Sequence, residues 1–144
     1  MSELYLIAFD GSAPSKRALD YGVERAKASD ARLLLAHVLE WSPYSFLSAE
    51  EVAERHKRRK EEVVRAESVI LSPIRDKLSK DGLNVTTEVR YGHVSDVICD
   101  LAKETKATQI IIGRTGETGF QARLFGSVTA TLSQMAPVPC TIVP

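Results

Sequence analysis

Residues 109–127 read QIIIGRTGETGFQARLFGS, and this stretch decides how the rest of the chain is interpreted. Its apolar beginning predicts a buried strand over 108–112, and the pattern from Val128 to Met135 predicts an amphipathic helix after it. Glycines stand between them at 113, 116, 119 and 126. Glycine allows positive φ and close approach of a ligand, while free N–H groups at a helix N-terminus attract anionic oxygens. We therefore expect phosphate binding in an α/β protein, with a helix starting at Gly126-Ser127.

The other apolar runs alternate with helical patterns along the chain. Further strands are predicted over 4–9, 32–39, 85–91 and 140–143, and helices follow the first four strands. Five strands alternating with four helices predict a mostly parallel sheet, covered by helices on both faces and joined by right-handed crossovers. This is an open, twisted α/β fold.

Several residues mark where the expected helices begin, break and bury their apolar face. Ser12 suits the N-cap of the first helix and Pro14 its first turn. A long helix is expected over 49–80, with Pro73 kinking or breaking it. The last helix should bury a stripe formed by Val128, Thr131, Leu132 and Met135.

Composition limits the classes of protein to which the chain can belong. Its 144 residues suit one domain over 1–144, and its 19 Lys+Arg balance its 19 Asp+Glu, so we expect no binding to nucleic acid or anionic membranes. No apolar run approaches a membrane span, and the first residues do not look like a signal peptide. Cys99 and Cys140 are expected to be reduced core thiols. We expect a soluble, cytoplasmic protein without membrane insertion.

The glycine spacing is specific when it is combined with the end of the first strand. Gly113, Gly116 and Gly126-Ser127 fit G-x2-G-x9-G-[ST], and Asp10 closes the first apolar run. The pattern resembles the ATP-binding branch of the universal stress protein family, and the resemblance extends over essentially the whole chain. It implies a Rossmann-like fold of the adenine nucleotide alpha hydrolase type, with strand order 3-2-1-4-5. In that order Asp10 and the glycine loop face each other across the crevice where strand order reverses.

The same resemblance implies a nucleotide site with distinct parts. Asp10 would lie near the ribose or a phosphate-bound metal, Val38 would present backbone groups to adenine, and the loop amides with two hydroxyls would hold phosphate. The implied site residues are Ala8, Asp10, Val38, Ile112, Gly113, Arg114, Gly116, Gly126, Ser127, Val128 and Thr129. Ala8 and Ile112 would form apolar walls around the base.

Plainer interpretations remain open for three of these features. Asp10 can be a turn residue before the first helix, and the glycine loop can be a simple connector. Arg114 replaces the small residue frequent in the family, and its guanidinium either binds phosphate or points into water. The sequence contains neither a P-loop nor a G-x-G-x-x-G after the first strand.

The favoured function is a regulatory protein that binds ATP, with or without Mg²⁺, and signals to an unidentified protein partner through conformation or oligomerisation. His37, His56 and His93 form no recognisable nucleophile arrangement, so catalysis has little support. The alternatives are a slow metal-dependent ATPase or nucleotide hydrolase using Asp10, and a nucleotide-free dimeric scaffold. By the resemblance, the edge strand Cys140–Val143 would pair in a homodimer or higher oligomer.

Overall fold

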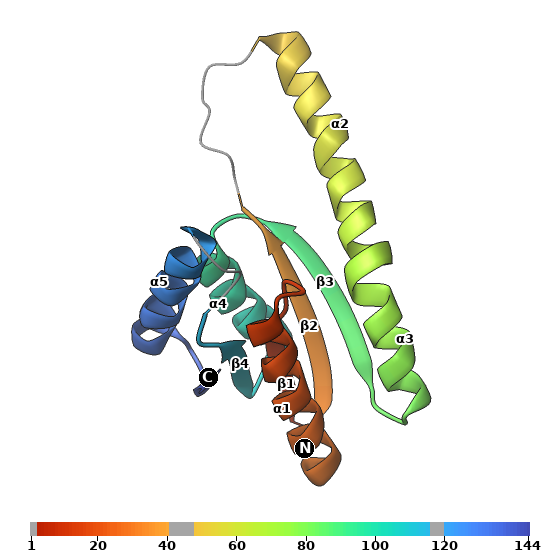
Figure 1. The fold of residues 1–144 in the computed structure, drawn as a ribbon, viewed down its shortest axis with the longest axis vertical. Helices are drawn as coiled ribbons and strands as arrows, with labels where there is room; N and C mark the ends of the chain where they lie inside the picture. Colours follow the sequence, from red (N-terminus) through yellow and green to blue (C-terminus); the bar gives the residue numbers. More distant parts are fainter. Residues whose placement is uncertain (1–2, 41–47, 116–119) are drawn as a thin grey trace.

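The computed structural model describes residues 3–40, 48–115 and 120–144, with the backbone alone described over 120–127. All strands of this part of the chain join one parallel sheet in the order β3-β2-β1-β4-β5 (Figure 1). The strands are β1 (Leu4–Ala8), β2 (Arg32–Leu39), β3 (Val85–Tyr91), β4 (Gln109–Gly113) and β5 (Cys140–Val143). The parallel pairing predicted from the alternating pattern is confirmed, and so is the strand order that the family resemblance implies.

The helical elements cover both faces of this sheet (Figure 1). They are α1 (Ala13–Ser29), α2 (Ala49–Arg65), the π-helix η1 (Ala66–Leu71), α3 (Ser72–Lys80), α4 (Val94–Thr105) and α5 (Phe120–Met135). Alternate strand residues feed two buried clusters. Ile7 and Leu35 pack with α1, η1 and α3, whereas Leu34 and Ile110 pack with α4 and α5. No helix among the described residues is long and apolar enough to cross a bilayer.

The predicted long helix is present, but it changes type before Pro73. The π-helix η1 separates α2 from α3, and Ser72 N–H donates to the Glu67 carbonyl across the wider turn. Pro73 has no N–H to donate, so the regular ladder is already interrupted at this point. Leu71 in η1 and Leu78 in α3 are buried against the sheet. In contrast, α2 has no buried residue and extends past the carboxyl ends of β2 and β3 (Figure 1).

Two expectations for the last helix are wrong. It begins at Phe120, so Gly126 and Ser127 lie inside α5 and do not start it. Residues 121–124 are good helix formers, and one interior glycine costs only about 1 kcal/mol, which explains why the helix continues through Gly126. Val128 and Leu132 are buried as expected, but Met135, in the final turn, is 58% exposed and does not belong to the buried stripe.

Candidate functional site

The strand order reverses between β1 and β4, so the switch point lies between the carboxyl ends of these two strands. β1 pairs with β2 on one side and with β4 on the other, and the chain leaves β1 into α1 on one face of the sheet. A methyl group added at Gly113 would lie 2.9 Å from the Pro14 carbonyl oxygen in the first turn of α1. The start of α1 and the end of β4 are therefore in contact, which gives Gly113 a packing reason that is independent of any ligand. We call the β1–α1 turn the first wall of the site, and the segment from Gly113 to Thr129 its second wall.

The first wall is a turn built by Asp10 and two serines. Asp10 Oδ1 accepts from the Ser12 N–H at 2.9 Å and from the Ser12 hydroxyl at 2.5 Å. Ser12 caps α1 by accepting from the Ser15 N–H at 3.3 Å, as expected. Asp10 therefore acts as a turn residue through one oxygen, and among the described residues nothing donates to its Oδ2, so that oxygen can accept from a ligand.

The backbone of Val38 faces this wall. The Ala36 carbonyl accepts from Phe9 N–H toward β1, and the Leu39 carbonyl accepts from Gly92 N–H toward β3. Backbone groups of alternate residues point the same way, so the Val38 N–H and carbonyl point toward β1. The pairing of β1 with β2 ends at Ala8↔Ala36, which leaves these Val38 groups past the last rung.

The apolar residues expected around the base lie on one face of the sheet. Ala8 and Ile112 are both buried in the cluster under α4 and α5, and half-buried Val38 packs at its margin. Any contact with a ligand is confined to the small exposed part of Ala8 and Val38.

The second wall differs most from the sequence prediction. Arg114 is exposed, and its backbone N–H donates to the Val143 carbonyl at 2.8 Å, so this amide is occupied by β5. The Thr129 hydroxyl donates to the carbonyls of Gly113 and Arg114, at 3.4 and 3.2 Å. Gly116 lies outside the described residues. Because α5 begins at Phe120, no helix N-terminus is present at Ser127.

The remaining candidate groups of the sequence are two histidines and the two cysteines. His56 is exposed on α2 and His93 precedes α4, while burial raises the pKa of both cysteine thiols, Cys99 and Cys140. The described part of the chain contains no group of three or more His, Cys, Asp or Glu side chains suited to a metal ion. Both cysteines are free thiols; Cys99 is buried as expected, whereas Cys140 is only half-buried. Their raised pKa values make them poor nucleophiles.

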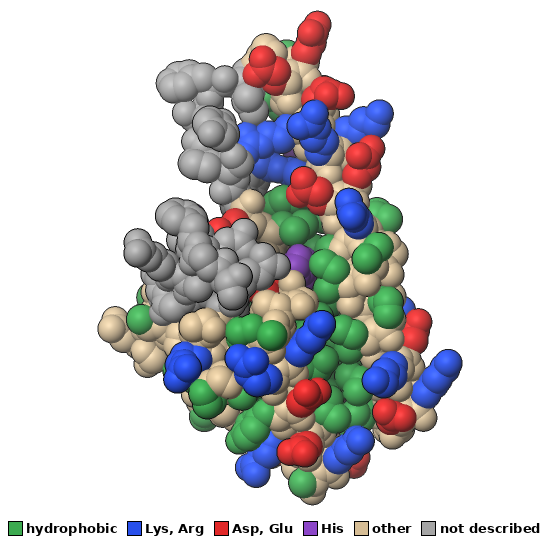
Figure 2. Space-filling model, viewed as in Figure 1, with side chains coloured by type: hydrophobic (Ala, Val, Ile, Leu, Met, Phe, Trp, Pro, Cys, Tyr) green, Lys and Arg blue, Asp and Glu red, His purple; other side chains and the backbone are tan. Residues whose placement is uncertain are grey.

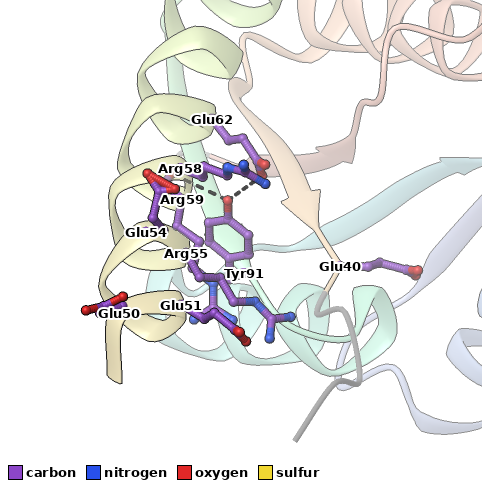
Figure 3. A pocket seen from close by; sticks show the side chains of 9 residues that line it. All are labelled: Glu40, Glu50, Glu51, Glu54, Arg55, Arg58, Arg59, Glu62 and Tyr91. Carbon is purple, nitrogen blue, oxygen red and sulfur yellow. Dashed lines mark hydrogen bonds between the residues drawn. The ribbon is translucent and has the colours of Figure 1, made fainter. Parts of the chain in front are cut away.

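A second hollow, which the sequence interpretation missed, lies between α2 and the ends of β2 and β3. It has a volume of about 600 Å³ and is lined by Glu40, Glu50, Glu51, Glu54, Arg55, Arg58, Arg59, Glu62 and Tyr91 (Figure 3). Tyr91 donates to Glu62 at 2.6 Å, and the Arg59 guanidinium stands 5.3 Å from the ring centre. Burial, followed by the bond to Glu62, raises the pKa of Tyr91 to about 12. Only the four-residue spacing of acids and bases along 50–62 could have indicated this surface.

The charges of α2 form no field of one sign. Figure 2 shows acidic and basic side chains interspersed along the helix. Glu51 precedes Arg55, and Glu54 precedes Arg58, by four residues, the spacing at which such pairs stabilise a helix. Residues 56–62 are exposed apart from half-buried Arg59, so this part of α2 is a solvated helix face.

The sheet order and the helices on both faces define an open, doubly wound α/β protein, a class in which the carboxyl ends of the strands are the usual place for ligands. The chain belongs to the universal stress protein family, whose model matches residues 1–144. It is 31% identical over 142 residues to a universal stress protein of Methanocaldococcus jannaschii, covering 96% of this chain and 79% of that protein. It is 30% identical to one from Bacillus subtilis, covering 96% of both.

Solved structures share the fold at lower identity. The universal stress protein UspA from Lactobacillus plantarum has a TM-score of 0.81 and 21% identity, with 99% of this chain and 97% of that chain covered. A family member from Arabidopsis thaliana with AMP bound has a TM-score of 0.64 and 22% identity, covering 98% and 90%. A universal stress protein from Archaeoglobus fulgidus in complex with dAMP has a TM-score of 0.61 and 20% identity, covering 100% and 98%.

Proposed function

We propose that this protein binds an adenine nucleotide at the switch point between β1 and β4, and that ATP is the preferred nucleotide. Nucleotide occupancy would then be passed to a protein partner through a change in conformation or oligomeric state. The observation that carries the proposal is the backbone of Val38, which offers an N–H and a carbonyl past the last rung of β1 and β2. Adenine presents a matching acceptor and donor on its six-position edge, whereas guanine presents the reverse.

The remaining site residues complete this assignment. Asp10 Oδ2 would accept from a ribose hydroxyl or bind a Mg²⁺ held by the phosphates, an ion that typically takes one or two carboxylates. Ala8 would border the base through its small exposed part, and fully buried Ile112 would support this apolar surface from within the core. Phosphate would be held by the second wall, whose assigned residues are Gly113, Arg114, Gly116, Gly126, Ser127, Val128 and Thr129.

The position of α5 sets a condition on phosphate binding. The Ser127 and Val128 N–H groups lie within a helix that begins at Phe120. For them to meet a phosphate, the helix has to begin near Ser127 in the nucleotide complex. We therefore infer that residues 120–126 leave the helix when ATP binds.

Related proteins support the nucleotide class. The Arabidopsis thaliana protein holds AMP and the Archaeoglobus fulgidus protein holds dAMP, and both carry the same adenine base. ATP as the bound nucleotide, and Mg²⁺ as its companion, are specific to our proposal. A slow Asp10-dependent hydrolysis is the second candidate, because Asp10 Oδ2 has no donor among the described residues.

Assembly follows from the edge of the sheet. β5 pairs with β4 on one side only, and Ile142 is 37% exposed. An apolar edge strand is a ready template for a second copy unless it is covered, so we infer a homodimer through Cys140–Val143. Pro139 and Pro144 bracket the strand and limit how far this pairing can extend.

Native mass spectrometry of the freshly purified protein tests both parts, because it reports bound nucleotide and subunit number together. We expect a dimer, and ATP should raise the free energy of unfolding by about 2.7 kcal/mol at a hundredfold excess over its Kd. GTP should stabilise less. Equal stabilisation by GTP and ATP contradicts the adenine assignment, and release of labelled phosphate in a single turnover would favour the hydrolase.

A further inference from the structure

At the end of the β1–β2 ladder, a side chain takes the place of a backbone N–H as the partner of a backbone carbonyl. Phe9 N–H donates to the Ala36 carbonyl at 2.8 Å. In a parallel ladder the next rung joins the Val38 N–H to the Phe9 carbonyl. The paired register stops before that rung, and the Phe9 carbonyl lies 2.8 Å from His37 Nδ1 instead.

This contact shows that Nδ1 of His37 carries a hydrogen. A carbonyl oxygen only accepts, so Nδ1 must carry the proton and donate it to Phe9. The imidazole is held firmly, since His37 is 9% exposed and is one of only three buried polar side chains among the described residues. By strand alternation it shares the face of Leu33 and Leu35, opposite to the face of Val38.

We propose that His37 is a positioning residue for adenine. By donating to the Phe9 carbonyl, its imidazole takes the place of the Val38 N–H and leaves that N–H directed into the crevice. The inference rests on the proposed function, because the ligand is the adenine nucleotide assigned to this site. His37 itself touches the strand end and not the base.

The physical reason is competition for one donor. Without the imidazole, the buried Phe9 carbonyl needs another partner, and the parallel register makes the Val38 N–H the next donor along the ladder. The sheet would then extend by one rung, and the N–H would be used before the ligand arrives. Loss of one such hydrogen bond changes affinity by about tenfold.

The test compares variants of His37 by titration calorimetry with ATP and with inorganic triphosphate. H37L and H37F remove the donor, H37N retains an amide N–H at the position of Nδ1, and H56L removes an exposed histidine as the matched control. We expect H37L and H37F to bind ATP about tenfold more weakly, with unchanged affinity for triphosphate. H37N and H56L should bind both like the wild type.

A second measurement observes the hydrogen bond itself. Scalar coupling between the Val38 nitrogen and the Phe9 carbonyl carbon, measured by NMR without nucleotide, should be absent in the wild type and present in H37L. Folded H37L and H37F with wild-type ATP affinity, or a folded H37N as weak as H37L, would overturn the proposal.

The two proposals fail in different ways. If the wild type binds no adenine nucleotide, the proposed function is wrong. The coupling in H37L still decides whether His37 controls the Val38 N–H: its appearance supports that role, and its absence overturns it. Since H37F preserves the ring volume, it keeps the comparison possible if H37L does not fold.

Discussion

The two walls of the switch-point crevice are built on different length scales. The β1–α1 wall is a turn in which Asp10, Ser12 and Ser15 bond to one another within six residues of chain. The β4–α5 wall depends on distant contacts, because Gly113 packs against Pro14 and the Thr129 hydroxyl reaches back 16 residues to the Gly113 carbonyl. Local bonds fix a turn whether or not a ligand is present. A wall held by distant contacts can change where its helix begins.

Gly113→Val should have the largest effect, because it forces the two walls apart. The new side chain would begin 2.9 Å from the Pro14 carbonyl, and overpacking of this kind costs about 1–3 kcal/mol. Urea unfolding should therefore show a loss near the upper end of that range, with a smaller loss for Gly113→Ala. A Gly113→Val protein as stable as the wild type would mean that the walls do not depend on each other.

Asp10→Asn should separate the two roles of the first wall. Asparagine keeps an Oδ1 acceptor for Ser12, so stability should change little, but a charge-assisted bond to ribose or Mg²⁺ is lost. We expect ATP affinity to fall by about tenfold or more in calorimetry. Asp10→Ala should lose the same affinity and, in addition, about 1 kcal/mol of stability. Unchanged ATP binding in Asp10→Asn would leave Asp10 as a turn residue only.

Gly126→Ala tests whether the start of α5, in the second wall, has to uncoil when ATP binds. Gly126 lies inside α5, where alanine is favoured over glycine by about 1 kcal/mol, so the free protein should become more stable. If the first turns of α5 must uncoil for phosphate, the same change should weaken ATP binding by a similar amount. Thermal unfolding with and without ATP measures both. Greater stability without weaker binding would contradict the uncoiling.

The contrast also explains what the sequence could predict. The parallel sheet follows from the alternation of strand and helix patterns, and the Ser12 cap follows from local chemistry; both are found in the structure. The strand order was implied by the family resemblance and is also found. The predicted start of α5 at Gly126-Ser127 was wrong, because the helix propensity of residues 121–124 outweighs the cost of one glycine. The π-helix and the role of the Phe9 carbonyl depend on hydrogen bonds between segments, which no local pattern encodes.

Tyr91 lies outside both walls, so Tyr91→Phe is a control for ATP binding and should have the smallest effect of these variants. Its pKa of about 12 exceeds the ordinary 10.0, so the folded state holds the phenolic proton more tightly than the unfolded state. The stabilisation should be fully present below pH 10 and decline as the pH rises through 12. Tyr91→Phe should remove this dependence in alkaline urea titrations and leave ATP affinity unchanged. Weaker ATP binding in Tyr91→Phe would show that the crevice extends to the second hollow.

The helix α2 has a consequence for how the protein can diversify. Since it buries no side chain, most substitutions on it leave the core and the crevice untouched. Apart from the contacts of Glu62 and Arg59 with Tyr91, the side chains of α2 are then constrained mainly by helix propensity, so its charge pattern can change at little cost in stability. Substitutions confined to α2 can therefore change which surfaces the protein contacts, while the sheet keeps the same strand ends and the same Val38 backbone.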